Sequence, residues 1–123
     1  MTAETLLLRQ IHPSFVQNGR VTSQAFRPTP KDELELSVDN GDLITPDAAW
    51  KRFTSQSTCS SSGVMAISNG ECSACELQVV QDGTPFPEHC YLDFSLLERK
   101  DSEKIGKRFS ALAQARGWLF QAK

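Results

Sequence analysis

The sequence lacks any long apolar run, since no stretch approaches the roughly 18 apolar residues of a membrane-spanning helix. Its first residues hold only a short apolar triplet where a secretory signal peptide needs a charged region and a longer apolar one. Basic residues are not in excess, because 13 lysines and arginines face 15 acids, for a formal net charge of −2. This balance provides no electrostatic footprint for duplex nucleic acid or an anionic membrane. We therefore expect a cytoplasmic protein that binds no membrane and whose partner is another protein rather than nucleic acid.

Motifs of the large catalytic families are also missing. The sequence has no glycine-rich dinucleotide loop, no Walker-type phosphate loop, no serine-hydrolase elbow and no H-E-x-x-H zinc motif. The acidic segment 39–42 lacks the ligand spacing and terminal glutamate of a calcium loop, so we interpret it as a turn. Consequently we assign no catalytic residue, expect no cofactor and leave open whether the protein is an enzyme.

The cysteines do not form a complete metal-binding pattern. Cys72 and Cys75 have the C-x-x-C spacing of metal sites and redox centres, but the second pair that zinc normally needs is missing. His89 and Cys90 are adjacent and would point to opposite faces of a strand. A redox pair usually opens a helix after a strand, and Cys72 does follow the apolar run at 64–67. We expect ordinary thiols and no metal, with zinc and redox roles as the alternatives.

The pattern of apolar residues predicts an α+β fold. A chain of 123 residues is long enough to bury a core as a single domain, 1–123. Short apolar or alternating segments, typical of strands, occur at 6–11, 34–38, 63–67, 77–80, 89–94 and 118–120. We expect these strands to form a small mixed or antiparallel sheet with one long C-terminal helix packed on a face.

Shorter helices are predicted from their first residues. Thr45 followed by Pro46 is a typical helix start, and this helix should run to about Phe53. A similar threonine–proline pair predicts one helical turn at 29–33. Residues 69–76 are compatible with either a short helix or a loop.

The longest predicted helix is C-terminal and runs to Arg116, with Gly117 as a typical helix end. It begins either at Ser95, where Glu98 would complete a capping box, or at Asp101. Apolar residues recur on one of its faces at helical spacing: Ile105, Phe109, Leu112 and Ala113.

The polar, irregular segment from Gly19 to Val38 is the best candidate for a site, because prolines hold it in a fixed shape before an apolar strand. Within it, Arg20, Ser23 and Arg27 offer hydrogen-bond donors that suit a phosphate or carboxylate. The alternative is that these arginines pair with acids of the same domain.

The only histidines are His12 and His89, the only groups whose unperturbed pKa lies near neutrality. Each lies at the edge of a predicted strand, a place that suits a general acid or base, although a structural role is the alternative. The candidate binding set is therefore His12, Arg20, Ser23, Arg27 and His89.

Short strings spread over most of the chain carry a resemblance. They are R-x-I-x-P at 9–13, GRVTSQAF at 19–26, LSV at 36–38, PEH at 87–89, DFS at 93–95 and ARGW at 115–118. Together they resemble a group of small bacterial proteins whose motifs carry no assigned activity. The resemblance implies a bacterial, cytoplasmic protein encoded with defence or mobile-element genes.

A second, looser pattern combines an arginine or histidine on the first strand, a serine on a later segment and an acid further on. The residues are Arg9 or His12, Ser23 or Ser37, and Glu88. Their order resembles that of compact ADP-ribosyltransferase-like toxin domains, which implies a nucleotide substrate.

Two functions are compatible with these features. A polar, proline-held segment without a catalytic constellation favours an accessory or adaptor protein that acts through protein–protein interaction in a bacterial defence or mobile-element system. The alternative is a small enzyme or ligand-binding domain for a nucleotide or another anionic substrate. Only the alternative requires both histidines to converge with the segment from Arg20 to Arg27 in one cleft.

Overall fold

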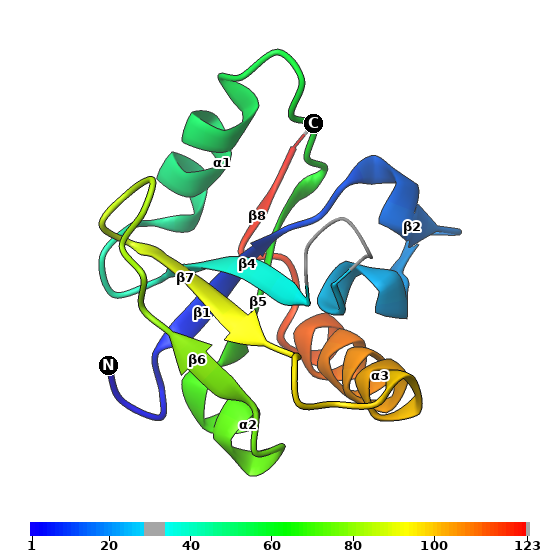
Figure 1. Cartoon of the computed structure of the whole chain (residues 1–123). Coiled ribbons are helices and arrows are strands. Elements are labelled where there is room, and N and C mark those ends of the chain that lie inside the picture. Colours follow the sequence, from blue (N-terminus) through cyan, green and yellow to red (C-terminus); the bar gives the residue numbers. More distant parts are fainter. Residues whose placement is uncertain (29–33, 123) are drawn as a thin grey trace.

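The computed structural model describes residues 1–28 and 34–122 around a six-stranded sheet (Figure 1). Its strands, in spatial order, are β6 (Gln78–Val80), β7 (His89–Asp93), β4 (Glu35–Asn40), β1 (Leu6–Gln10), β5 (Gly63–Ser68) and β8 (Phe120–Gln121). A separate hairpin joins β2 (Val16–Gln17) to β3 (Arg20–Val21). Each pairing between these strands is antiparallel, which decides between the two predicted kinds of sheet.

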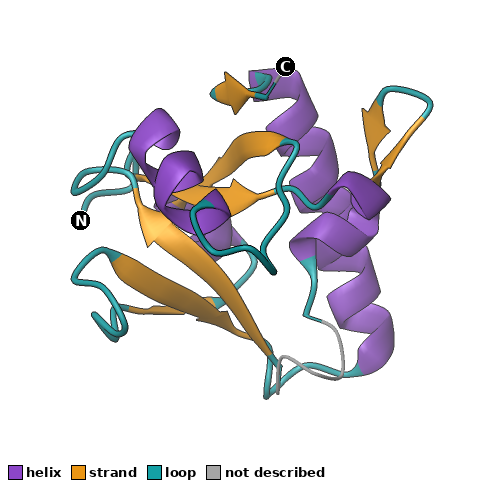
Figure 2. Cartoon of the chain, turned by 90° about the horizontal axis from the view of Figure 1, so that it is seen from above, coloured by secondary structure: helices purple, strands orange, loops and turns teal. Residues whose placement is uncertain are grey.

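Helices cover both faces of the sheet (Figures 1 and 2). One face carries α1 (Pro46–Thr54), and the opposite face carries α2 (Asn69–Ala74) and α3 (Arg99–Arg116). Because side chains alternate along a strand, β1 contributes to two cores: Leu7 packs on the α3 side and Leu8 on the α1 side. The predicted α+β fold with a long C-terminal helix on one face is confirmed.

The same alternation explains β4. Leu36 and Val38 are buried in the α3-side core, so Ser37 and Asp39 lie on the α1 side. The predicted strand included Leu34, which instead precedes β4 with a φ of +67° and remains 47% exposed. The strand therefore begins one residue later than expected.

The helix ends show how local side chains set element boundaries. Thr45 caps α1 by accepting a hydrogen bond from the amide of Ala48 (3.4 Å), as predicted. Ser68 and Glu71 form a full capping box for α2, which makes 69–74 a helix rather than a loop. Gly117 follows α3 with a φ of +91°. None of the described helices is long and apolar enough to cross a membrane.

The start of α3 corrects the prediction. The helix begins at Arg99 with Glu98 as its N-cap residue, so neither Ser95 nor Asp101 is the start. The carboxylate of Asp93 accepts a hydrogen bond from the amide of Ser95 (2.8 Å), which stabilises a turn directly after β7. This local bond competes with the predicted capping box and keeps the following residues out of the helix.

The polar segment before β4 is only partly irregular. Asn18 and Gly19 both adopt positive φ angles (52° and 77°) in the predicted turn between β2 and β3. Short 3-10 helices flank this hairpin, η1 (Pro13–Phe15) before it and η2 (Ser23–Phe26) after it, and η2 packs against α3. The helical turn predicted at 29–33 lies outside the described residues.

Candidate functional site

A cavity of about 380 Å³ opens on the α1 side of the sheet. Strand register forms its floor, because Leu8 of β1 is paired with Asp39 of β4, and Asp39 with His89 of β7. Paired residues lie side by side and point to the same face, so these three line the cavity together. Gln10 of β1 and Ser37 of β4 extend the same floor along the strands.

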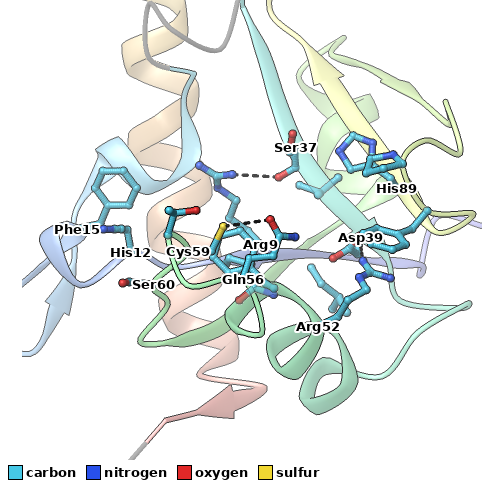
Figure 3. Close-up of a pocket in the computed structure, with 17 residues that line it drawn as sticks. Arg9, His12, Phe15, Ser37, Asp39, Arg52, Gln56, Cys59, Ser60 and His89 are labelled. Carbon is cyan, nitrogen blue, oxygen red and sulfur yellow. Dashed lines mark hydrogen bonds and ion pairs between the residues drawn. The ribbon is translucent and has the colours of Figure 1, made fainter.

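Walls rise around this floor from separate elements (Figure 3). Each contributes one phenylalanine: Phe15 from η1, Phe53 from α1 and Phe86 from the loop between β6 and β7. The segment after α1 adds polar side chains, and Figure 3 shows Gln56 and Cys59 between the two sides of the cavity. This volume is within the range of small-molecule sites, which starts at roughly 300 Å³.

Arg52 organises one wall. Its guanidinium group binds Asp39 (3.1 Å) and Glu88, which contribute from β4 and from the residue before β7. The Cζ atom also lies 3.9 Å from the centre of the Phe86 ring, a cation–π contact. One side chain of α1 therefore ties β4, β7 and the β6–β7 loop together at the cavity.

Asp39 lies in this wall, although burial of its carboxylate costs free energy of desolvation. Burial raises the pKa of its carboxyl group above the ordinary value and outweighs the opposing effects of Arg52 and His89. The charged form is therefore disfavoured relative to water, even beside a guanidinium group. Arg52 limits this cost, and its own charge is balanced by two carboxylates.

Arg9 lines the cavity from β1 and joins it to the α3 side. Its Nε donates to the carbonyl of Ala25 (2.8 Å), and its Nη1 donates to the carbonyl of Ser37 (3.1 Å; Figure 3). Guanidinium donors that are held by two fixed backbone oxygens have a defined position, which a binding group requires.

The two histidines present different nitrogen atoms. Nδ1 of His12 accepts a hydrogen bond from the amide of Ser14 (3.0 Å), so the proton of the neutral ring is on Nε2, which is a donor. Nδ1 of His89 lies 2.7 Å from Asp82, whose carboxylate only accepts, so Nδ1 donates and, in the neutral ring, Nε2 is an acceptor. A histidine oriented by a carboxylate is suited to accept a proton from a ligand.

Only part of the predicted site lies at this cavity. His12 and His89 line it together, but the ligand-binding alternative also requires the segment from Arg20 to Arg27 in the same cleft. Arg20, Ser23 and Arg27 are not among its lining residues. Arg27 instead pairs with Glu103 of α3 (3.4 Å), which fits the alternative in which the arginines pair with acids.

The residues of the looser resemblance divide in the same way. Arg9, His12 and Ser37 line the cavity. Glu88 binds Arg52 at its edge, while Ser23 belongs to η2 beside α3. A transferase activity remains a prediction that this geometry does not test.

The cysteines are free, and Cys72, on the inner face of α2, is fully buried. Burial, with smaller effects of Cys75 and Glu71, raises the pKa of its thiol to about 12. Such a thiol is almost entirely protonated at neutral pH and is a poor nucleophile. Across residues 1–28 and 34–122, no group of histidine, cysteine, aspartate or glutamate side chains is arranged to hold a metal ion.

These environments predict unequal thiol labelling. In the native protein, a water-soluble alkylating reagent should modify the partly exposed Cys59 and Cys75, whereas Cys72 and Cys90 should react only after unfolding. Peptide mass spectrometry after a short labelling pulse measures each site, and labelling in denaturant is the control. Native labelling of Cys72 at the rate of Cys59 would contradict this prediction and favour a redox pair.

Sequence reasoning missed Arg52, Asp39 and Phe86. Arg52 resembles an ordinary basic residue in the last turn of a helix, and Asp39 resembles part of a turn. The one available signal was the alternation of side chains along the strand, which places Asp39 on the face opposite to the buried Leu36 and Val38. Comparisons with protein-family models, curated proteins and solved structures find no match to this chain.

Proposed function

We propose that the protein binds a small molecule that combines a flat ring with a negatively charged group, the class to which nucleotides belong. The observation that supports this proposal is a cavity that brings Arg9 and His12, which are near each other in the chain, together with the distant His89. Phenylalanine rings on three sides suit an apolar or aromatic portion of the ligand. A small enzyme acting on such a ligand is included in the proposal, with His89 as its base.

We propose that the two portions of the ligand lie at different ends of the cavity. The anionic group would bind Arg9, whose guanidinium group is positioned by the carbonyls of Ala25 and Ser37, and the Nε2 donor of His12. Figure 3 shows His12 and Phe15 on the side opposite to Asp39 and Arg52. The ring would then lie toward Phe53 and Phe86.

An adaptor that acts through protein–protein interaction remains a prediction from the sequence. It would act through the polar segment from Gly19 to Val38, in which Arg27 is engaged by Glu103. Large exposed apolar side chains among the described residues belong to separate segments: Met1, Leu34, Leu43 and Leu96. These observations favour the cavity as the functional site.

A thermal-shift screen against nucleotides, dinucleotides and polyphosphates tests the proposal. Ligands that bind only the native state raise the melting temperature, and a concentration of ten times Kd should give about 4–8 °C for a domain of this size. Compounds with both a ring and an anion should give the largest shifts. No shift from any compound in the panel would reject the proposal.

Matched variants locate the binding site. Ser37→Trp should fill the cavity and abolish the shift, whereas Glu35→Trp, on the same face of β4 but outside the lining, should preserve it. Arg20→Ala and Arg27→Ala should also preserve the shift. Loss of binding in these arginine variants, with binding retained in Ser37→Trp, would move the site to the polar segment predicted from the sequence.

A further inference from the structure

Gln10 is an unusual member of the cavity lining. Both its amide oxygen and its amide nitrogen are shut off from solvent, and neither has a hydrogen-bond partner among the described residues. It follows Leu8 on the same face of β1, so its side chain lies on the α1 side, where the cavity opens. A wholly unpaired amide therefore adjoins a cavity that we propose to be a ligand site.

Unpaired buried amides are uncommon in native proteins, because a donor or acceptor removed from water normally finds a partner. An apolar residue of similar shape would occupy this position at a lower cost. Retention of an unsatisfied group beside a cavity is the pattern of a site whose polar groups are completed when a ligand binds.

We infer that Gln10 recognises the edge of a nucleobase-like heterocycle, with its amide paired to an adjacent donor and acceptor on the ring. An amide presents one acceptor and two donor hydrogens in a single plane, which matches the hydrogen-bonding edge of a base. In forming this pair, the ring takes the place of the atoms that now shut the amide off from solvent. The inference rests on the proposed function and names the ligand group that the cavity selects.

Removing the amide should weaken binding of the base without lowering stability. Gln10→Met keeps the length of the side chain and removes both unpaired atoms, so the free protein should melt at the same or a higher temperature. The same variant should lose base selectivity. If the amide had a purely structural role, Gln10→Met would instead lower the melting temperature of the free protein.

Isothermal titration calorimetry with AMP, CMP, GMP, UMP and ribose 5-phosphate separates the two proposals. The wild type should bind at least one nucleotide about tenfold to a hundredfold more tightly than ribose 5-phosphate, the range that one bidentate amide–base pair supplies. Gln10→Met should remove most of this difference while leaving the affinity for ribose 5-phosphate unchanged. Gln10→Glu, which lacks the amide donor, should also reduce this preference for the nucleotide. It is the variant to use if Gln10→Met does not fold.

Each other outcome has a definite meaning. Equal binding of nucleotides and ribose 5-phosphate by the wild type, or an undiminished preference in both Gln10 variants, would overturn this inference and leave the proposed anion site intact. A clearly lower melting temperature of Gln10→Met would show that the amide is satisfied in the free protein, and would also overturn the inference. Binding of none of these compounds would reject both proposals.

Discussion

Replacing Gly63 with alanine should lower the free energy of unfolding by about 2–5 kcal/mol, from overpacking and backbone strain together. Gly63 begins β5 with a φ of +153°, a conformation that residues with a side chain rarely adopt. A Cβ atom at this position would lie 2.3 Å from the carbonyl oxygen of Phe120 and 2.9 Å from the Trp118 ring. Since the closest atom belongs to the backbone, a change of side-chain rotamer cannot relieve the clash.

The clash should push the C-terminal strand, β8, away from β5. Gly63 is paired with Gln121, and Val64 with Phe120, so these two positions hold β8 on the edge of the sheet. Moving β8 away would also disturb the contact between Phe120 and Trp50 of α1, whose ring centres lie 5.1 Å apart. The α1-side core would therefore lose packing together with the strand.

Gly117→Ala is the matched control. Gly117 also has a positive φ, +91°, and it precedes the same strand, but a Cβ atom added there would meet no atom of the described residues within 4 Å. This variant should lower the free energy of unfolding by only about 1–2 kcal/mol, because it adds backbone strain at a positive φ but no steric clash. Urea denaturation of both variants measures the difference, and equal losses would contradict a steric role for Gly63.

Elements with strong local signals were predictable from the sequence. Alternation identified β4, and the spacing of Ile105 and Phe109 identified the buried face of α3. The start of α3 was not predictable, because Asp93 and the potential cap at Ser95 offer two local hydrogen-bonding patterns to the same backbone. Choosing between them depends on where β7 ends, which is set by its partner strand.

Which residues line the site depends more on the spatial order of the strands than the boundaries of single helices and strands do. His12 and His89 were identifiable as titratable residues near strand ends, but their shared cavity follows from the spatial order of β7, β4 and β1. No local pattern encodes that order. Conversely, Ser23 and Arg27 were grouped with them by proximity in sequence, whereas η2 packs against α3, where both residues lie against Gly106.

Replacing Arg52 with alanine should both destabilise the protein and impair ligand binding. Asp39 and Glu88 would remain side by side, each with a side chain only 13% exposed, without the guanidinium group that now bridges them. Removing one partner from a buried ion pair costs about 3–5 kcal/mol, and partial exposure of Arg52 reduces our expectation to about 2–4 kcal/mol. The loop that carries Phe86 would also lose its contact with α1.

The effect of Arg52→Ala should depend on pH with a definite sign. Without Arg52, the pKa of Asp39, which burial already raises, should rise further, so the folded state would bind protons more readily than the unfolded state. The free energy of unfolding of the variant should then increase relative to that of the wild type as the pH falls from 7 toward about 5, because Asp39 becomes protonated. Urea denaturation at both pH values measures the difference in free energy of unfolding between wild type and variant, which should be smaller at the lower pH.

Arg99→Ala provides the comparison for a lost arginine. The side chain of Arg99 is 93% exposed and makes one ion pair with Glu103 along α3 (3.2 Å), so its removal should change stability by less than about 0.5 kcal/mol. Arg52→Lys retains the charge but cannot bridge both acids in a fixed plane, and an intermediate loss is expected. If Arg52→Ala were no more harmful than Arg99→Ala, the wall of the cavity would not depend on this bridge. Its ligand site would then have to be held by the strand register of Leu8, Asp39 and His89 alone.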